Sequence, residues 1–172
     1  GVIRDEIYPM TLKAVLQGNN LFGAAVLDAK DLSTIVVGTN LREDNPTYHG
    51  EMVTIDRFYR MENRPDPADT VFLSTHEPCP MCLSALAWAG FREIYYLFGY
   101  GETADDFAMP TDREMLEQIF LSKGTAYRNA FFSMYSIREL AQEHEEREKL
   151  LGVIAVLKSM YLSLPVRDMA VG

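Results

Sequence analysis

Hydrophobic and polar positions follow two different spacings along the chain, one typical of helices and one typical of strands. Residues 4–17 ("RDEIYPMTLKAVLQ") carry apolar side chains at helical spacing and are followed by a stop signal at Gly18. Two short runs rich in small and β-branched residues come next, "FGAAVLDA" at 22–29 and "STIVVGTN" at 33–40. The polar residues between these two runs predict a β-hairpin.

The middle of the chain alternates between predicted helices and predicted strands. "HGEMVTIDRFYRMEN" (49–63) predicts a helix that ends before the proline-rich segment 64–69. "TVFLST" (70–75) predicts a buried strand, and "PCPMCLSALAWAG" (78–90) a helix that begins at its prolines and stops at its last glycine. "EIYYLFGY" (93–100) predicts a further strand. Strands separated by helices favour an α/β sheet with covering helices.

The last third of the chain has a different pattern. "FGYGETADDF" (98–107) is predicted to be a loop, and from about residue 111 the sequence predicts helices only, at 112–120 and 136–162. The chain contains no internal repeat, low-complexity tract or clear linker, and 172 residues are a usual length for one domain. We therefore expect a single domain over residues 1–172, with a helical C-terminal extension from about residue 111.

Composition and charge narrow the class of protein. Hydrophobic residues make up 48% and charged residues 24% of the chain, which favours a globule with a sizeable core. The net charge of -9 argues against a nucleic-acid partner, because such binding depends on Lys and Arg that neutralise phosphates. The first residues lack the apolar core of a secretory signal, and the most apolar later stretch is interrupted by Lys158. We expect a cytoplasmic protein without a membrane-spanning segment.

Both cysteines of the chain, Cys79 and Cys82, lie in "STHEPCPMC". A disulfide between residues this close would gain little from closing so short a loop. Thiolates at positions i and i+3 instead lie on the same side of the first turn of a helix, where the helix dipole favours negative charge. That arrangement suits a soft divalent ion such as zinc. A structural zinc site usually has four protein ligands, so the remaining ligands must come from other residues.

His49 is the candidate for a third ligand. It precedes a predicted helix, and two neighbouring helices that enter from the same edge of a sheet bring their N-termini together. Two cysteines and one histidine leave a fourth position for water, which is the pattern of a catalytic zinc site. Glu51 could reach that water as a proton acceptor and donor. His144, in "QEHEER", is predicted to lie on a solvated helix face and not to bind metal.

The triplet "HGE" and the later "PCPMC" match the H-x-E and P-C-x-x-C signature of the zinc-dependent cytidine and nucleobase deaminase superfamily. The chain resembles this superfamily from about Phe22 to Phe98, a stretch that includes the hairpin, both motif helices and the strand between them. The resemblance implies a three-layer α/β/α sandwich around a mixed, about five-stranded sheet.

The resemblance also implies roles for the matching residues. His49, Cys79 and Cys82 would bind Zn²⁺, and Glu51 would shuttle the proton. Zinc lowers the pKa of its water, so that hydroxide can attack the ring carbon that bears the amino group. Glu51 would serve first as the base and then as the acid.

Four residues bear on the substrate. Glu77, before the motif proline, resembles the guanine deaminase and tRNA adenosine deaminase branch, as does "NPTYHGE". Gly50, where that branch usually has alanine, resembles cytosine deaminases of the yeast type. Asn40 resembles the asparagine at a strand end with which relatives contact the base or sugar, although capping a strand is an alternative role. Asn40, Glu77 and His76 are therefore the candidate substrate contacts, and for His76 a structural role is the alternative.

The segment "NAFFSMYSIRELAQ" resembles the C-terminal helix of bacterial tRNA adenosine deaminases but lacks its arginines. Together with the acidic charge, this favours a small-molecule substrate. We expect zinc-dependent hydrolytic deamination of a free nucleobase or nucleoside, with a guanine-like purine favoured and ammonia released. The alternatives are a cytosine- or cytidine-type deaminase, a tRNA adenosine deaminase, and a zinc-stabilised binding module without turnover. Because relatives are commonly homodimers, the resemblance also implies a homodimer.

Overall fold

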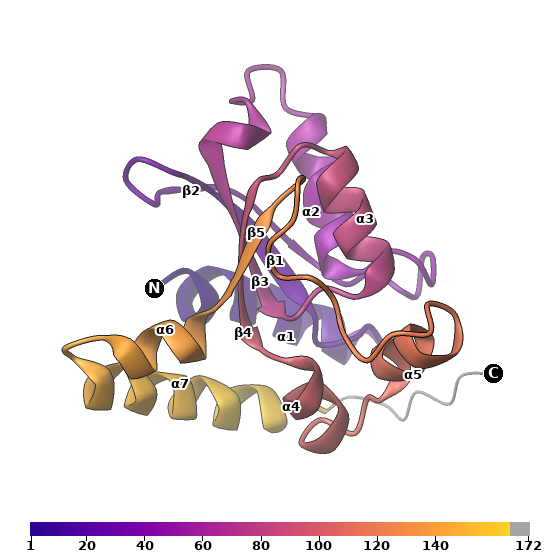
Figure 1. Ribbon diagram of the computed structural model, residues 1–172, viewed down its shortest axis with the longest axis vertical. Helices are drawn as coiled ribbons and strands as arrows, with labels where there is room; N and C mark the ends of the chain where they lie inside the picture. The colour runs from indigo at the N-terminus through magenta and orange to yellow at the C-terminus, as the bar shows by residue number, and fades with distance from the viewer. Residues whose placement is uncertain (166–172) are drawn as a thin grey trace.

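The computed structural model describes residues 1–165, in which five strands form one mixed sheet in the order β2-β1-β3-β4-β5 (Figure 1). The strands are β1 (Gly23–Asp28), β2 (Thr34–Thr39), β3 (Thr70–His76), β4 (Glu93–Phe98) and β5 (Ser133–Ser136). The helices are the π-helical turn η1 (Ile3–Ile7), α1 (Tyr8–Leu16), α2 (Gly50–Tyr59), the 3-10 turn η2 (Pro67–Asp69), α3 (Pro80–Trp88), α4 (Tyr100–Asp105), α5 (Thr111–Gln118), α6 (Ile137–Glu143) and α7 (Arg147–Leu162).

The directions of the strands follow from the lengths of their connections. β1 and β2 pair antiparallel through a short turn, which confirms the predicted hairpin, and β1 also pairs antiparallel with β3. β3, β4 and β5 run parallel. Parallel neighbours need a crossover, and α3 supplies it between β3 and β4. The carboxyl ends of β3 and β4 therefore lie at the same edge of the sheet, where His76 pairs with Phe98.

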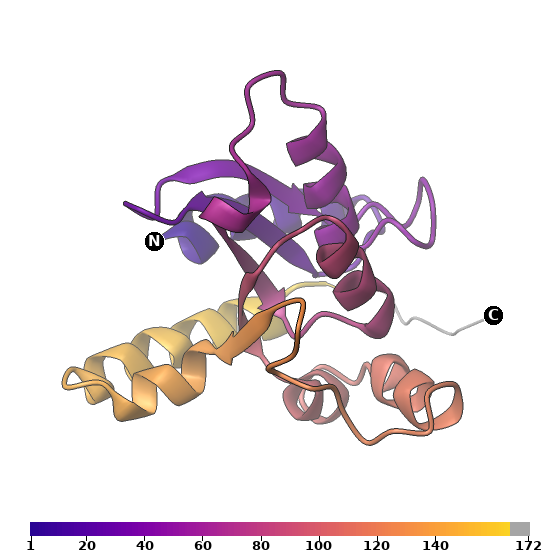
Figure 2. The same ribbon diagram turned by 45° about the horizontal axis from the view of Figure 1, so that its top comes forward.

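Successive residues of the strands face opposite sides of the sheet and form two separate cores. Ala24 and Val26 of β1 pack in one cluster with buried side chains of α2 and α3. Ala25 and Leu27 pack in the other, with buried side chains of α1 and α7. Figure 1 shows α2 and α3 on one side of the sheet, and Figure 2 shows α6 and α7 side by side on the other. These layers confirm the predicted α/β/α sandwich.

The helix that carries the cysteines ends as the sequence predicts. Gly90, directly after the last turn of α3, has a φ of +82°, in the left-handed region that glycine tolerates best. Its backbone N–H donates to the carbonyl of Ala87 at 3.1 Å. The predicted helix stop is therefore confirmed by the backbone conformation.

The prediction of helices alone after residue 111 was wrong. Residues Ser133–Ser136 form β5, and Tyr96 of β4 pairs with Ser136. Four residues are too few to show a period-two pattern, and it is the open edge of β4 that makes them a strand. The predicted helix over 136–162 is also broken, because His144 is extended (ψ 150°) between α6 and α7.

The prediction of a loop over 98–107 was wrong as well, since α4 occupies Tyr100–Asp105. Its start is fixed by Glu102, whose Oε2 accepts a hydrogen bond from the backbone N–H of Gly99 at 3.4 Å. The Thr103 hydroxyl donates to the Gly99 carbonyl at 3.0 Å. Capping contacts of this kind stabilise a helix too short to show apolar periodicity.

Two further expectations concern the chain as a whole. The single domain over residues 1–172 stays a prediction, and its last seven residues, 166–172, lie outside the described residues. Within residues 1–165, none of the helices combines the length and the apolar character that crossing a membrane requires.

Candidate metal centre and adjoining cavity

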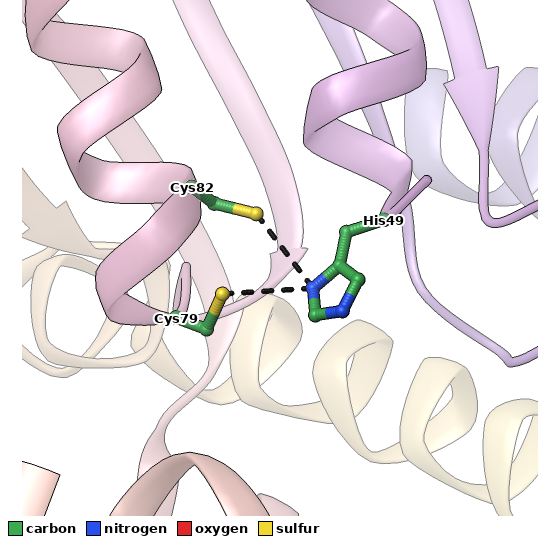
Figure 3. Close-up of side chains that lie close together, drawn as sticks. All are labelled: His49, Cys79 and Cys82. Atoms are coloured by element: carbon green, nitrogen blue, oxygen red, sulfur yellow. Dashed lines mark hydrogen bonds between the residues drawn. The ribbon is translucent and has the colours of Figure 1, made fainter. Parts of the chain in front are cut away.

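The N-termini of α2 and α3 bring the three candidate ligands together. His49 is the N-cap residue of α2 and Cys79 the N-cap residue of α3, both with extended backbones. Cys82 lies one turn into α3 and is fully buried. Figure 3 shows both sulfur atoms directed at the same edge of the His49 imidazole. The predicted convergence of two helix N-termini is thus observed.

The distances within this cluster fit zinc. The Nδ1 atom of His49 lies 3.5 Å from Cys79 Sγ and 3.7 Å from Cys82 Sγ. Zn–S bonds of about 2.3 Å and Zn–N bonds of about 2.0 Å at a tetrahedral angle place sulfur and nitrogen roughly 3.5 Å apart. Within residues 1–165, this is also the one group of metal-binding side chains whose ligand atoms all lie within 4.8 Å of one another.

The three members of the cluster have pKa values shifted in different directions, so that binding of a metal would displace protons from Cys82 and His49. The hydrogen bond that Cys82 donates to Cys79, and after it the one that His49 donates, outweighs burial and lowers the pKa of Cys79 to about 4. The pKa of Cys82 is raised by the same hydrogen bond and by burial. Burial disfavours protonated His49, but its hydrogen bond to Cys79 and the charges of Cys79 and Glu51 outweigh burial and raise its pKa to about 9.

Glu51 lies on the first turn of α2, two residues after His49, and is buried. Its Oε1 accepts a hydrogen bond from the Ser74 hydroxyl on β3 at 3.0 Å, and its Oε2 lies 3.5 Å from Cys82 Sγ. Burial, followed by the charge of Cys79, raises the pKa of Glu51. The carboxylate is therefore held in one orientation beside the three ligand atoms, as a proton acceptor requires.

Gly50, between His49 and Glu51, lies against the start of β1. A Cβ atom at Gly50 would lie 2.6 Å from the carbonyl oxygen of Phe22 and 2.9 Å from the Cα of Gly23. Both contacts are with backbone, which cannot rotate away. This close approach gives a physical reason for glycine at position 50, where the guanine deaminase and tRNA adenosine deaminase branch usually has alanine.

We predict that Gly50→Ala lowers the free energy of unfolding by about 1–3 kcal/mol, as overpacking of a tight site does. Chemical denaturation of the two proteins measures this difference. The matched control is Gly152→Ala in α7, where an added Cβ meets nothing within 4 Å. There we expect a gain of about 0.5–1 kcal/mol, because alanine is favoured over glycine inside helices. Equal stability of Gly50→Ala and the parent protein would contradict the predicted clash.

A cavity of about 130 Å³ opens beside the cluster. Its walls include the imidazole of His49, the thiol of Cys79 and the carboxylate of Glu51. The remaining lining residues come from the segment before β1, from the end of β3 and from the region of α5; they are Asn20, Phe22, Glu77, Met109, Thr111, Asp112 and Met115. The cavity combines apolar walls with a few polar groups, which is typical of small-molecule sites.

The three candidate substrate contacts occupy different positions relative to this cavity. Glu77 lines it, and its Oε2 accepts a hydrogen bond from the backbone N–H of Tyr100 at 3.0 Å. Burial raises the pKa of the Glu77 carboxyl. Asn40 is fully buried behind the wall, and its Oδ1 accepts from the backbone N–H of Asn20 at 3.1 Å. Its Nδ2 has no hydrogen-bond partner among the described residues.

His76 lies outside the lining of the cavity. Its ring is surrounded by aromatic side chains, with centroids 4.8 Å from Phe22 and 5.0 Å from Phe107. Its Nδ1 lies 3.0 Å from the Thr75 hydroxyl, and burial lowers its pKa to about 3. His76 is therefore a neutral imidazole behind Phe22, and its contact with substrate stays a prediction.

Several cavity residues were missed by the sequence reasoning. Asp112, at the start of α5, is the most consequential, because it adds a third carboxyl to the wall of the cavity besides those of Glu51 and Glu77. Burial, and then the charge of Cys79, raises its pKa to about 7. The only signal in the sequence was an acidic residue in the first turn of a predicted helix, which is common at exposed helix N-termini.

A three-layer α/β/α fold with one histidine and two cysteines at neighbouring helix N-termini defines a cytidine deaminase-like protein with a site for zinc. The chain belongs to the family described as the cytidine and deoxycytidylate deaminase zinc-binding region, whose model matches residues 6–98. All three candidate ligands and Glu51 lie within this matched stretch.

Similar proteins differ in their reported substrates. The chain is 30% identical over 86 residues to guanine deaminase of Bacillus subtilis (strain 168), which covers 49% of this chain and 54% of that protein. It is 29% identical over 76 residues to tRNA-specific adenosine deaminase of Rickettsia bellii (strain RML369-C), covering 43% of this chain and 52% of that protein. The chain spans about half the length of the curated relatives it matches.

The solved structure of guanine deaminase from Bacillus subtilis is similar in fold. The TM-score is 0.54 at 22% sequence identity, covering 83% of this chain and 89% of that one. Likeness of this degree supports the arrangement of the sheet and helices.

Proposed function

We propose that the protein is a zinc-dependent hydrolytic deaminase of a free nucleobase, with guanine-like purines favoured. The observation that carries the proposal is the buried carboxylate of Glu51, which borders both the His49, Cys79 and Cys82 cluster and the cavity. A zinc site with a purely structural role does not need a carboxylate in this place. A non-catalytic binding module is therefore the weaker alternative.

When bound, zinc supplies a Lewis acid that makes a water molecule acidic near neutral pH. Glu51 accepts one proton of the attacking water and delivers it to the ring nitrogen beside the carbon that bears the amino group, while the water oxygen bonds to that carbon. Glu51 then passes the second proton of the water to the amino group. The carbon–nitrogen bond breaks, ammonia leaves, and the oxygen remains on the carbon as a carbonyl. Ser74 holds Oε1 of Glu51, so that Oε2 remains on the side of the cluster.

The size of the cavity favours a free base. A cavity of about 150 Å³ is known to hold one benzene ring, so the volume of about 130 Å³ suits a small planar heterocycle better than a base that carries a ribose. Phe22 in the wall offers an apolar surface to such a ring. The small volume also disfavours a nucleotide within an RNA chain.

The polar groups of the cavity favour guanine. Glu77 and Asp112 place two carboxyl groups in its wall, and their oxygen atoms can accept hydrogen bonds from the N–H groups of a ligand. Guanine offers N–H groups on both of its rings in addition to its exocyclic amino group, whereas cytosine has a single ring N–H. The matched guanine deaminase is consistent with this preference. Glu77 and Asp112 line the cavity and are the proposed direct substrate contacts, whereas Asn40 and His76, which are outside its lining, stay predicted contacts.

The experiment that tests the substrate is ammonia release by the zinc-loaded protein from guanine, adenine, cytosine, guanosine and a tRNA anticodon stem-loop. We expect the highest kcat/KM for guanine. Turnover of cytosine without turnover of guanine would identify a cytosine-type enzyme. Salt-sensitive turnover of the stem-loop alone would identify a tRNA deaminase. Silence of the zinc-loaded protein across the whole series would favour the non-catalytic module.

We also propose that the protein forms a homodimer through the exposed apolar surface of α3. Trp88, the only tryptophan of the chain, is 92% exposed, and Phe131 is 65% exposed. A groove of about 520 Å³ runs between them, lined mainly by Leu83, Ala87, Trp88, Phe131 and Phe132. Exposed apolar surface of this kind is typical of protein interfaces.

The cytoplasmic location of the protein stays a prediction.

We expect Trp88→Ala to shift a dimer toward monomer in sedimentation velocity at micromolar concentration. Dilution of the parent protein should move the Trp88 fluorescence to longer wavelength, because dissociation exposes the indole to water. The control is Val156→Ala, which removes an exposed apolar side chain of α7 outside this surface. A parent protein that is monomeric at these concentrations would contradict the homodimer, and a dimer unaffected by Trp88→Ala would contradict this interface.

A further inference from the structure

Lys158 of α7 forms two ion pairs with α4. Its Nζ lies 3.1 Å from Oε1 of Glu102 and 2.6 Å from Oδ2 of Asp106. Arg138 of α6 also donates to Oε1 of Glu102, at 2.9 Å. The side chains of Lys158 and Glu102 are 26% and 23% exposed. Water and salt therefore screen the attraction between these two charges less than they would for a fully exposed ion pair. Figure 1 shows α4 beside the C-terminal half of α7.

The same Glu102 fixes both ends of α4. Its side chain accepts from the backbone N–H of Gly99 at the start of the helix. Its backbone carbonyl accepts from the N–H of Asp106 at 2.9 Å and from that of Phe107 at 3.2 Å, where the helix ends. Lys158 therefore contacts the residue that determines where the chain leaves α4.

The chain that leaves α4 becomes the wall of the cavity. Ala108 has a φ of +55°, a conformation that costs an L-residue roughly 1–2 kcal/mol. The next residue, Met109, donates its backbone N–H to the Thr103 carbonyl at 3.0 Å and lines the cavity, as does Asp112 three residues later. A disfavoured backbone conformation persists only where the surrounding structure holds it.

We propose that Lys158 is a positioning residue, which holds the segment from Asp106 to Asp112 in the conformation that completes the cavity wall. Its effect on substrate affinity rests on the proposed function, whereas its effect on the segment does not. Lys158 contacts Glu102 and Asp106 and does not line the cavity, so it acts through these two carboxylates and not on the reacting atoms. The C-terminal helix thereby supports the binding site from outside its lining.

Loss of the Lys158 charge should leave the fold intact. α7 is also held by the buried side chains of Ile154, Leu157 and Tyr161, which pack in the core beneath the sheet. The consequences of Lys158→Ala should therefore be confined to the segment that follows α4.

The test compares Lys158→Ala with two other variants in the zinc-loaded protein. Lys149→Ala is the matched control, because Lys149 lies on the same helix and pairs with Glu146, but its side chain is 71% exposed. Lys158→Arg is the conservative rescue, since it keeps a charge that reaches both carboxylates. Hydrogen exchange of the backbone amides of Asp106, Phe107 and Met109 reports on the segment directly, because all three are hydrogen-bonded.

For Lys158→Ala we expect exchange at these amides to accelerate about tenfold, with exchange in β1 and β3 unchanged. KM for the purine should rise about tenfold and kcat change by less than about twofold, as loss of a substrate-binding wall predicts. Lys149→Ala should match the parent protein. Lys158→Arg should keep both the amide exchange rates and KM close to those of the parent protein.

Unchanged exchange at these amides would overturn the proposal, and so would exchange that accelerates equally across the sheet. Unchanged KM together with faster exchange would overturn the link to substrate binding. If the parent protein turns over no purine, the proposed function fails, but the exchange measurement still decides whether Lys158 holds the segment.

Discussion

Replacing Glu51 with glutamine will abolish ammonia release while zinc remains bound. Glutamine keeps the shape of the side chain and can still accept the hydrogen bond from Ser74, but its amide cannot take up a proton. General acid–base groups contribute about 10²–10⁴-fold to rates, so we expect kcat to fall by at least about 100-fold. The measurement is steady-state ammonia release, with the zinc content determined on the same sample.

The matched control is Glu145→Gln, the same substitution at an exposed position between α6 and α7, which should leave kcat unchanged. Glu51→Gln with nearly full activity would show that another group moves the proton. Loss of zinc from Glu51→Gln would show instead that the carboxylate holds the metal centre together. Each of these results would change the role assigned to Glu51.

Replacing Cys82 with alanine will remove zinc and the stability that zinc provides. Cys82 is fully buried in the first turn of α3, and its loss leaves His49 and Cys79 as the only members of the cluster. A ligand that binds only the native state stabilises it by about 4 kcal/mol at 1,000 times its dissociation constant. The parent protein should therefore lose several degrees in Tm when a chelator removes zinc, and Cys82→Ala should show no zinc-dependent change.

Two variants serve as controls for this result. His144→Ala removes an exposed histidine between α6 and α7, so it should retain both zinc and the Tm shift. Glu51→Gln should also retain the shift, because it loses a proton acceptor and keeps all three ligands. A Tm shift of full size in Cys82→Ala would contradict the proposed ligand set.

The metal centre could be predicted from the sequence because its parts are local. Each ligand lies at or next to the start of a helix that the sequence marks, and the strand before α3 fixes the place of Cys79 at the edge of the sheet. The pairing of β3 with β4 then needs only a right-handed crossover of ordinary length. Local signals of this kind can be recognised in a single sequence without knowledge of tertiary contacts.

The cavity wall could not be predicted, because it depends on contacts between distant residues. Asp112 reaches the cavity only because α4 and α5 fold back over the edge of the sheet, and Ala108 turns the chain there in a conformation that its residue type does not indicate. Likewise, Ser133–Ser136 become a strand by pairing with β4. Tertiary contacts decided all of these features, and propensity decided none of them.

The central claim is that the cluster of His49, Cys79 and Cys82 serves hydrolysis through Glu51, and metal dependence of turnover tests it most directly. Ammonia release from guanine should be measured with metal-free protein and with the same protein after addition of one equivalent of Zn²⁺. We predict no release without metal and full activity at one equivalent, with xanthine formed in equal amount. Equal activity of the metal-free protein, or no release by protein that has bound one zinc ion, would contradict this account.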